Sequence, residues 1–249
     1  QDSNARQLQL LAKFNLGEGD SERQRAHSWN VMPRKGEVVS GQPLVSRRVQ
    51  SHGEEIANSV SHGVGLIAAL AGSPFLIAQA VEGGRTTAVV GASVFATTLV
   101  LLFLGSTLYH ALPPGKGKRV FRVIEHSAIF LVIAGTYTPF TLGVLQGAWG
   151  WTLTVTVWVL ASAGVLLKTV GGAGHPKLSI ALYLGMGWLI LVAVRPLWLS
   201  VPPAGIAWLL LGGIAYTVGV AFYAAQRVPY AHFVWHLFVL AGASCHFLA

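Results

Sequence analysis

The sequence predicts an all-α integral membrane protein, folded as a bundle of seven transmembrane helices. Only 10% of its 249 residues are charged, against roughly 25% in soluble domains, and its mean hydropathy is +0.58. Most of the chain beyond residue 57 consists of apolar runs, each close to the ~20 residues that cross a bilayer as a helix. Because these runs are continuous rather than alternating, they exclude a transmembrane β-barrel.

The chain divides into two parts by composition. Residues 1–52 are polar and charged, with no apolar run long enough to span, and predict a disordered cytoplasmic N-terminal arm. Residues 53–249 are predicted to form the seven-helix transmembrane domain. Its expected spans, separated by short connections rich in turn residues, are 58–81, 88–111, 123–145, 149–169, 178–198, 204–225 and 230–249.

The basic residues predict the orientation. With the arm inside, the cytoplasmic connections and their flanks hold seven Lys and Arg residues, and the opposite side holds Arg85 and Arg195. By the positive-inside rule the N-terminus is cytoplasmic and, after seven spans, the C-terminus is outside. The same distribution accounts for the net charge of +8, so nucleic acid is excluded as a partner. The seven cytoplasmic residues are Lys116, Lys118, Arg119, Arg122, Lys168, Lys177 and Arg227.

Histidines converge at one membrane depth in this topology. His110 ends the second span, and His232 and His236 begin the seventh, so all three lie near the cytoplasmic face. His232 and His236 are four residues apart on one helix face, with Cβ atoms ~5–6 Å apart. Three imidazoles around zinc leave a fourth position for water, as in catalytic zinc sites. The single cysteine, Cys245, excludes a Cys-based zinc ribbon or an internal disulfide.

Two further polar residues fall at the same depth. Glu125, at the start of the third span, is predicted to be a general base or to orient water, and Ser106, one turn before His110, to stabilise an oxyanion. Ionisable residues inside a membrane are costly, which favours a functional site over a metal-free polar network. We expect His62 to have a capping or packing role, and His246 to lie away from the metal.

The motifs of the transmembrane part, taken in order, are highly specific. On these motifs the sequence resembles the hemolysin III family, the bacterial branch of the progestin and adipoQ receptor group that includes the adiponectin receptors. The wider superfamily is similar to alkaline ceramidases. The motifs are Glu54-Glu55-x-x-Asn58-x-x-Ser61-His62-Gly63, Ser106-x-x-x-His110, Glu125-His126-Ser127-Ala128-Ile129, Ile133-Ala134-Gly135-Thr136-Tyr137-Thr138-Pro139, Gly212-Gly213-x-x-Tyr216-x-x-Gly219 and His232-x-x-x-His236.

The resemblance implies seven helices with a cytoplasmic N-terminus, in a bacterial inner membrane. It also implies zinc bound by His110, His232 and His236, with Ser106 and an acid nearby. The family usually carries Asp at the position of Glu125, so the longer side chain leaves direct ligation and contact through water both open.

The expected function is a zinc-dependent hydrolase of a lipid amide or ester, with membrane lipids and a lipid-like substrate as partners. The alternative is a lipid-responsive receptor or regulator in which the zinc is structural. A cytolytic pore is disfavoured, because the spans carry few polar stripes and no ring of charges. The sequence leaves the substrate and the oligomeric state open.

Overall fold

The computed structural model describes residues 48–145, 147–171 and 176–249, and these residues form helices without any strand. Residues 1–47 of the predicted arm lie outside the described residues. The elements are α2 (His52–Glu82), α3 (Thr86–Ala111), α4 (Lys116–Thr138), the π-helix η1 (Pro139–Leu145), α5 (Gly147–Gly171), α6 (Pro176–Trp188), the 3-10 helix η2 (Leu189–Ala193), α7 (Val194–Ser200), α8 (Pro203–Ala224) and α9 (Ala231–Leu248).

Seven helical segments in the described part of the chain are long and apolar enough to cross a membrane, which confirms the predicted fold class. The third joins α4 to η1, and the fifth joins α6, η2 and α7. The largest differences from the sequence prediction are two helix starts, at His52 and Lys116 instead of 58 and 123. Hydropathy locates the apolar stretch, whereas helical hydrogen bonding continues into polar turns at the membrane surface.

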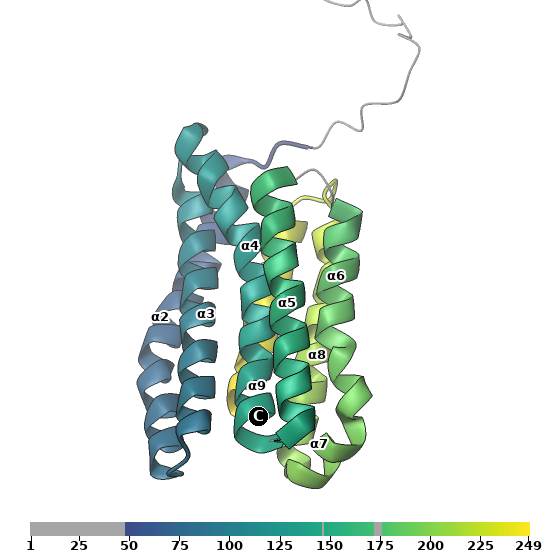
Figure 1. Cartoon of the computed structure of the whole chain (residues 1–249). Coiled ribbons are helices and arrows are strands. Elements are labelled where there is room, and N and C mark those ends of the chain that lie inside the picture. The colour runs from purple at the N-terminus through teal and green to yellow at the C-terminus, as the bar shows by residue number, and fades with distance from the viewer. Residues whose placement is uncertain (1–47, 146, 172–175) are drawn as a thin grey trace, which may run out of the picture. The chain divides into compact units, whose positions relative to one another are not determined.

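The helices follow one another around a ring (Figure 1). α2 packs against α3 and α9, α3 against α4, α4 against α5, and α8 against α9, while α6 contacts α4, α5 and α8. The contact between α2 and α9 closes the ring. We call the end where α2, α4, α6 and α9 begin the proximal end, and the other the distal end; the proximal end is at the top of Figure 1.

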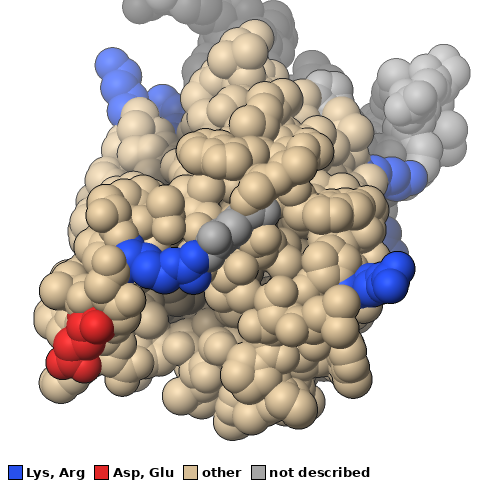
Figure 2. Space-filling model, turned by 60° about the horizontal axis from the view of Figure 1, so that its bottom comes forward, with Lys and Arg blue, Asp and Glu red and all other residues tan. Residues whose placement is uncertain are grey.

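The bundle is apolar outside and polar at several points inside. Ile67, Phe75 and Leu166 are 65–72% exposed, whereas Ser106 and His236 are fully buried. Figure 2, in which the distal end comes forward, shows a face made mostly of uncharged residues, with scattered basic ones and a small acidic patch. This distribution suits a protein that has lipid around it and satisfies its polar groups internally.

A carboxylate joins the starts of α2 and α9. Ser51 and Glu54 form a capping box, in which the Ser51 side chain accepts from the Glu54 backbone N–H, and Glu54 accepts from the Ser51 N–H. The same carboxylate accepts from the backbone N–H of Tyr230, at 2.7 Å, and pairs with Arg48. The first turns of α2 and α9 are thereby held at the same depth, which places the α9 histidines beside α2.

Candidate metal centre

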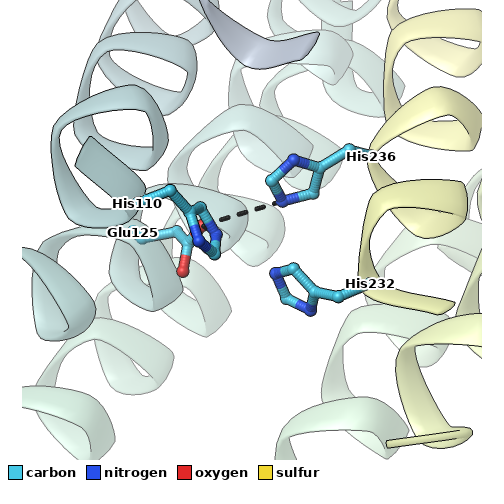
Figure 3. A group of neighbouring side chains, drawn as sticks. All are labelled: His110, Glu125, His232 and His236. Carbon is cyan, nitrogen blue, oxygen red and sulfur yellow. Dashed lines mark ion pairs between the residues drawn. The ribbon is translucent and has the colours of Figure 1, made fainter. Parts of the chain in front are cut away.

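Four side chains from three helices meet at the proximal end. His110 lies in the last turn of α3, Glu125 in α4, and His232 and His236 in the first turns of α9. Each offers one ligand atom, and these atoms lie within 4.8 Å of one another. Figure 3 shows the two α9 imidazoles extending toward His110 and Glu125. We call these four residues the His/Glu cluster; they include all three histidines that the sequence predicted as metal ligands.

The cluster contains buried nitrogens that lack hydrogen bonds. The Nε2 atoms of His110, His232 and His236 are buried without a hydrogen-bond partner among the described residues, as is Glu125 Oε2. Glu125 Oε1 lies 3.4 Å from His110 Nε2 and 4.0 Å from His236 Nε2. Leaving a buried polar atom unsatisfied costs about 1–3 kcal/mol. A single cation would satisfy all of these atoms together.

The donor set fits zinc in number and type. Zinc binds imidazole nitrogen and carboxylate oxygen at ~2.0–2.2 Å in a tetrahedron, so two of its ligand atoms lie ~3.4 Å apart. The ligand atoms of the cluster lie within 4.8 Å of one another. A bound ion would therefore draw the most widely separated of them together by up to ~1.4 Å.

Residues of α2 hydrogen-bond the Nδ1 atom of His110, the ring nitrogen that points away from the cluster. His110 Nδ1 lies 2.7 Å from Glu55 Oε2 and 3.4 Å from Asn58 Nδ2. The other Glu55 oxygen pairs with Lys118 at 3.0 Å. A carboxylate can only accept from a ring nitrogen, so Nδ1 carries the proton and Nε2 keeps its lone pair. Metal-ligating histidines are usually oriented by such a carboxylate.

His236 is held from the same helix. Its Nδ1 lies 3.2 Å from the Asn58 carbonyl oxygen and 3.2 Å from Ser61 Oγ. A proton on Nδ1, donated to the carbonyl, again leaves the Nε2 lone pair directed at the cluster. Helix α2 supplies none of the cluster's four ligand atoms, but it sets the tautomer and orientation of two of the three imidazoles.

A short hydrogen-bonded chain runs alongside the cluster. The Ser106 hydroxyl donates to Glu125 Oε1 at 2.7 Å and lies 2.6 Å from His62 Nδ1. Because the hydroxyl proton goes to the carboxylate, His62 Nδ1 must be the donor to Ser106. The His62 ring also stacks on His236, with centroids 3.6 Å apart and planes 6° from parallel.

An elongated cavity extends from Glu125, the member of the His/Glu cluster that lines it, toward the distal end. It has a volume of about 330 Å³. His62 and Glu125 line its proximal part, and Tyr216 and His246 line its distal part. The walls between are mainly apolar, including Val132, Ile133, Leu209, Val220 and Val239. Such a volume is in the range of small-molecule pockets.

Sequence reasoning placed the cluster and Ser106 together, and the structure does bring them together. It favoured capping or packing for His62 over an approach to the zinc, and the structure shows that His62 stacks on His236 and hydrogen-bonds Ser106. It gave no role to Glu55 and Asn58. A signal was available, because Glu55, Asn58 and His62 are spaced by three and four residues, which puts three polar groups on one face of an apolar helix.

These features define a class: a seven-helix integral membrane protein with a buried His/Glu cluster that can hold a metal ion. The model of the Haemolysin-III related family matches residues 50–247, and this chain belongs to that family. A hemolysin-3 homolog of Bacillus subtilis (strain 168) is 44% identical over 194 residues, covering 78% of this chain and 91% of the relative. Hemolysin-3 of Bacillus cereus is 42% identical over 203 residues, covering 82% and 93%.

A more distant relative comes from the progestin and adipoQ receptor group. The human monocyte to macrophage differentiation factor is 26% identical over 206 residues, covering 79% of this chain and 82% of the relative. No solved structure matches the chain. The resemblance seen in the sequence motifs is thereby confirmed for both the family and the wider group.

Proposed function

We propose that this protein is a zinc-dependent hydrolase of a lipid amide or ester. The observation that carries the proposal is the position of the His/Glu cluster at one end of an apolar cavity within a membrane bundle. The Nε2 atoms of His110, His232 and His236, which lack hydrogen bonds among the described residues, would bind the metal, and a lipid chain would occupy the cavity. His110, His232 and His236 are the proposed metal ligands, and Glu125 and Ser106 the proposed catalytic residues.

Zinc, when bound, would supply Lewis-acid polarisation of a carbonyl and of water. Glu125 is placed to take a proton from the attacking water, because Oε2 has no hydrogen-bond partner among the described residues. Its other oxygen accepts from Ser106 at 2.7 Å, which fixes the carboxylate rotamer. General bases of this kind contribute about 10²–10⁴-fold to a rate.

For Ser106 we propose a first role other than oxyanion stabilisation. Its hydroxyl donates to Glu125 Oε1, which supports a role in orienting the proposed base. To stabilise an oxyanion it would have to rotate toward the substrate and release Glu125. His62 Nδ1, at 2.6 Å, remains a donor that holds the serine oxygen in either case.

The substrate class follows from the walls of the cavity. A mainly apolar lining favours an alkyl chain over a polar ligand that would lose its water. The amide or ester of the lipid would lie at the polar proximal end. A lipid can reach such a site sideways from the bilayer. Two Bacillus relatives are named hemolysin-3. We do not extend lysis to this chain, because pores are lined by rings of charged or polar groups rather than by apolar walls.

For the setting we propose a bacterial inner membrane with the proximal end in the cytoplasm. The connections and flanks that carry the seven predicted cytoplasmic Lys and Arg residues lie at the proximal end, and Arg85 and Arg195 belong to the distal end. In this orientation residues 1–52 are a cytoplasmic arm before the transmembrane domain, and the His/Glu cluster lies near the inner leaflet.

A lipid-responsive receptor is the second candidate. Contacts around the cluster join α3, α4 and α9, and the bonds from Glu55 and Asn58 add α2. A metal there would tie four helices together, and a lipid in the cavity could shift their packing. In that case the zinc would be structural and the protein would not turn over substrate.

Lipid turnover, measured together with metal content, tests the proposal. Purified full-length protein is assayed on a panel of lipid amides and esters, as wild type, Glu125→Gln and Glu82→Gln. Glu82 is an exposed carboxylate at the distal end and serves as the matched control. We expect Glu125→Gln to retain zinc and lose 10²–10⁴-fold in rate, with Glu82→Gln unchanged. Zinc-loaded wild type that cleaves none of these lipids would favour the receptor.

A further inference from the structure

The distal part of the cavity contains a second polar point, formed by Tyr216 of α8 and His246 of α9. Their ring centroids are 5.4 Å apart, and both residues line the cavity. Tyr216 Oη and His246 Nδ1 are buried and have no hydrogen-bond partner in the described part of the chain. Sequence reasoning placed His246 away from the metal and gave it no role.

Two glycines make room for this pair in a reciprocal way. Gly212 precedes Tyr216 by four residues on α8, and a Cβ there would lie 2.8 Å from His246 Nε2. Gly242 precedes His246 by four residues on α9, and a Cβ there would lie 2.7 Å from Tyr216 Cε1. Each helix therefore carries a glycine that receives the polar ring of the other helix. Both rings are therefore fixed between α8 and α9 by close packing.

The hydrogen-bonding chemistry of the pair selects one kind of group. With the ring proton on Nε2, the His246 Nδ1 atom that lacks a partner among the described residues is a hydrogen-bond acceptor. Tyr216 Oη offers a proton. A hydroxyl group accepts from the phenol and donates to the imidazole, so one hydroxyl satisfies both atoms. Unsatisfied polar groups inside a bilayer are costly, which favours an occupant of this kind.

The distance to the His/Glu cluster sets where that hydroxyl lies on a ligand. His236 and His246 are ten residues apart on α9, an axial separation of ~15 Å at 1.5 Å per residue. An extended alkyl chain, with carbon–carbon bonds of ~1.5 Å at near-tetrahedral angles, covers ~15 Å in about twelve bonds. The wall between the two polar points is mainly apolar.

We propose that Tyr216 and His246 form a distal site for the hydroxyl group of a long-chain lipid, about twelve carbons from the carbonyl held at the His/Glu cluster. This inference rests on the proposed occupancy of the cavity by a lipid chain. It adds a preference for hydroxylated chains to the proposed substrate class.

The test compares free fatty acids, the products that hydrolysis of any lipid amide or ester would leave. Purified full-length protein in nanodiscs is titrated with octadecanoate, 12-hydroxyoctadecanoate and 2-hydroxyoctadecanoate, each displacing a fluorescent fatty acid. One or two added hydrogen bonds predict that wild type binds the 12-hydroxy chain about three- to tenfold more tightly than octadecanoate. The 2-hydroxy chain should not gain affinity in this way.

Tyr216→Phe removes one oxygen and keeps the ring against Gly242, so the fold is retained. We expect it to abolish the preference for the 12-hydroxy chain and to leave octadecanoate affinity unchanged. His246→Leu should have the same effect on the preference, and Tyr230→Phe, at an exposed tyrosine of the proximal end, should have none.

Each contrary outcome has a distinct meaning. Equal wild-type affinity for octadecanoate and the 12-hydroxy chain would overturn the distal site and leave the proposed function standing. The distal site would also be overturned if Tyr216→Phe still preferred the 12-hydroxy chain, or if wild type bound the 2-hydroxy chain equally tightly. Failure of every fatty acid to bind would overturn the proposed lipid occupancy and this inference with it.

Discussion

Glu55 offers the sharpest test of how the metal centre is built, because it acts through His110 rather than on the metal. Its Oε2 lies 2.7 Å from His110 Nδ1, and its Oε1 pairs with Lys118 at 3.0 Å. Glu55→Ala removes the acceptor that holds the ring in its metal-binding tautomer. Loss of such an outer partner typically weakens metal affinity 10–100-fold, or by about 1.4–2.7 kcal/mol.

A second side chain near His110 limits the loss of zinc affinity expected in Glu55→Ala. Asn58 Nδ2 lies 3.4 Å from His110 Nδ1, so its amide could turn its oxygen to Nδ1 once the carboxylate is gone. We therefore expect Glu55→Ala to weaken zinc affinity by about tenfold, at the lower end of this range. The double variant with Asn58→Ala should weaken it by about a hundredfold. Glu55→Gln keeps an acceptor without its charge and should lose less than Glu55→Ala.

Competition of the purified protein with a zinc chelator measures these affinities. Thermal unfolding of the metal-free forms separates lost affinity from lost fold, and Glu82→Gln is the carboxylate control. Zinc affinity of Glu55→Ala within twofold of wild type, in a folded protein, would refute the view that α2 orients the ligand.

Three further outcomes follow from the same geometry. His232→Ala removes one of the three Nε2 donors, and elemental analysis should find near-stoichiometric zinc in wild type and almost none in the variant; unchanged content would contradict the ligand set. Ser106→Ala frees Glu125 Oε1 and should slow lipid hydrolysis by about 10–100-fold, as one lost hydrogen bond to a charged group is worth about 1.5–3 kcal/mol. Ser244→Ala, whose exposed hydroxyl donates to the Leu240 carbonyl of its own helix, should leave that rate unchanged. A reporter fused after Ala249 should report a non-cytoplasmic location, and a cytoplasmic signal would reverse the proposed orientation.

Hydropathy and spacing were sufficient for the parts of this protein that are local in sequence. An apolar run near 20 residues has one stable form in lipid, a helix, so seven such runs determine the fold class. The i,i+4 spacing of His232 and His236 likewise determines that both imidazoles share a helix face. The depth of His110 and Glu125 followed from the order of the spans and needed no knowledge of which helices touch.

The tertiary structure alone decided which groups face one another. The contact of α2 with α3 brings Glu55 to the His110 ring. α2 and α9 are the first and last spans, and their contact brings Asn58 and Ser61 to the His236 ring, far along the chain. The pairing of Tyr216 with His246 likewise depends on two glycines on different helices. Sequence periodicity states which residues share a face of one helix. It contains no information about the helix that packs against that face, since lateral order in a bundle is set by side-chain packing between spans.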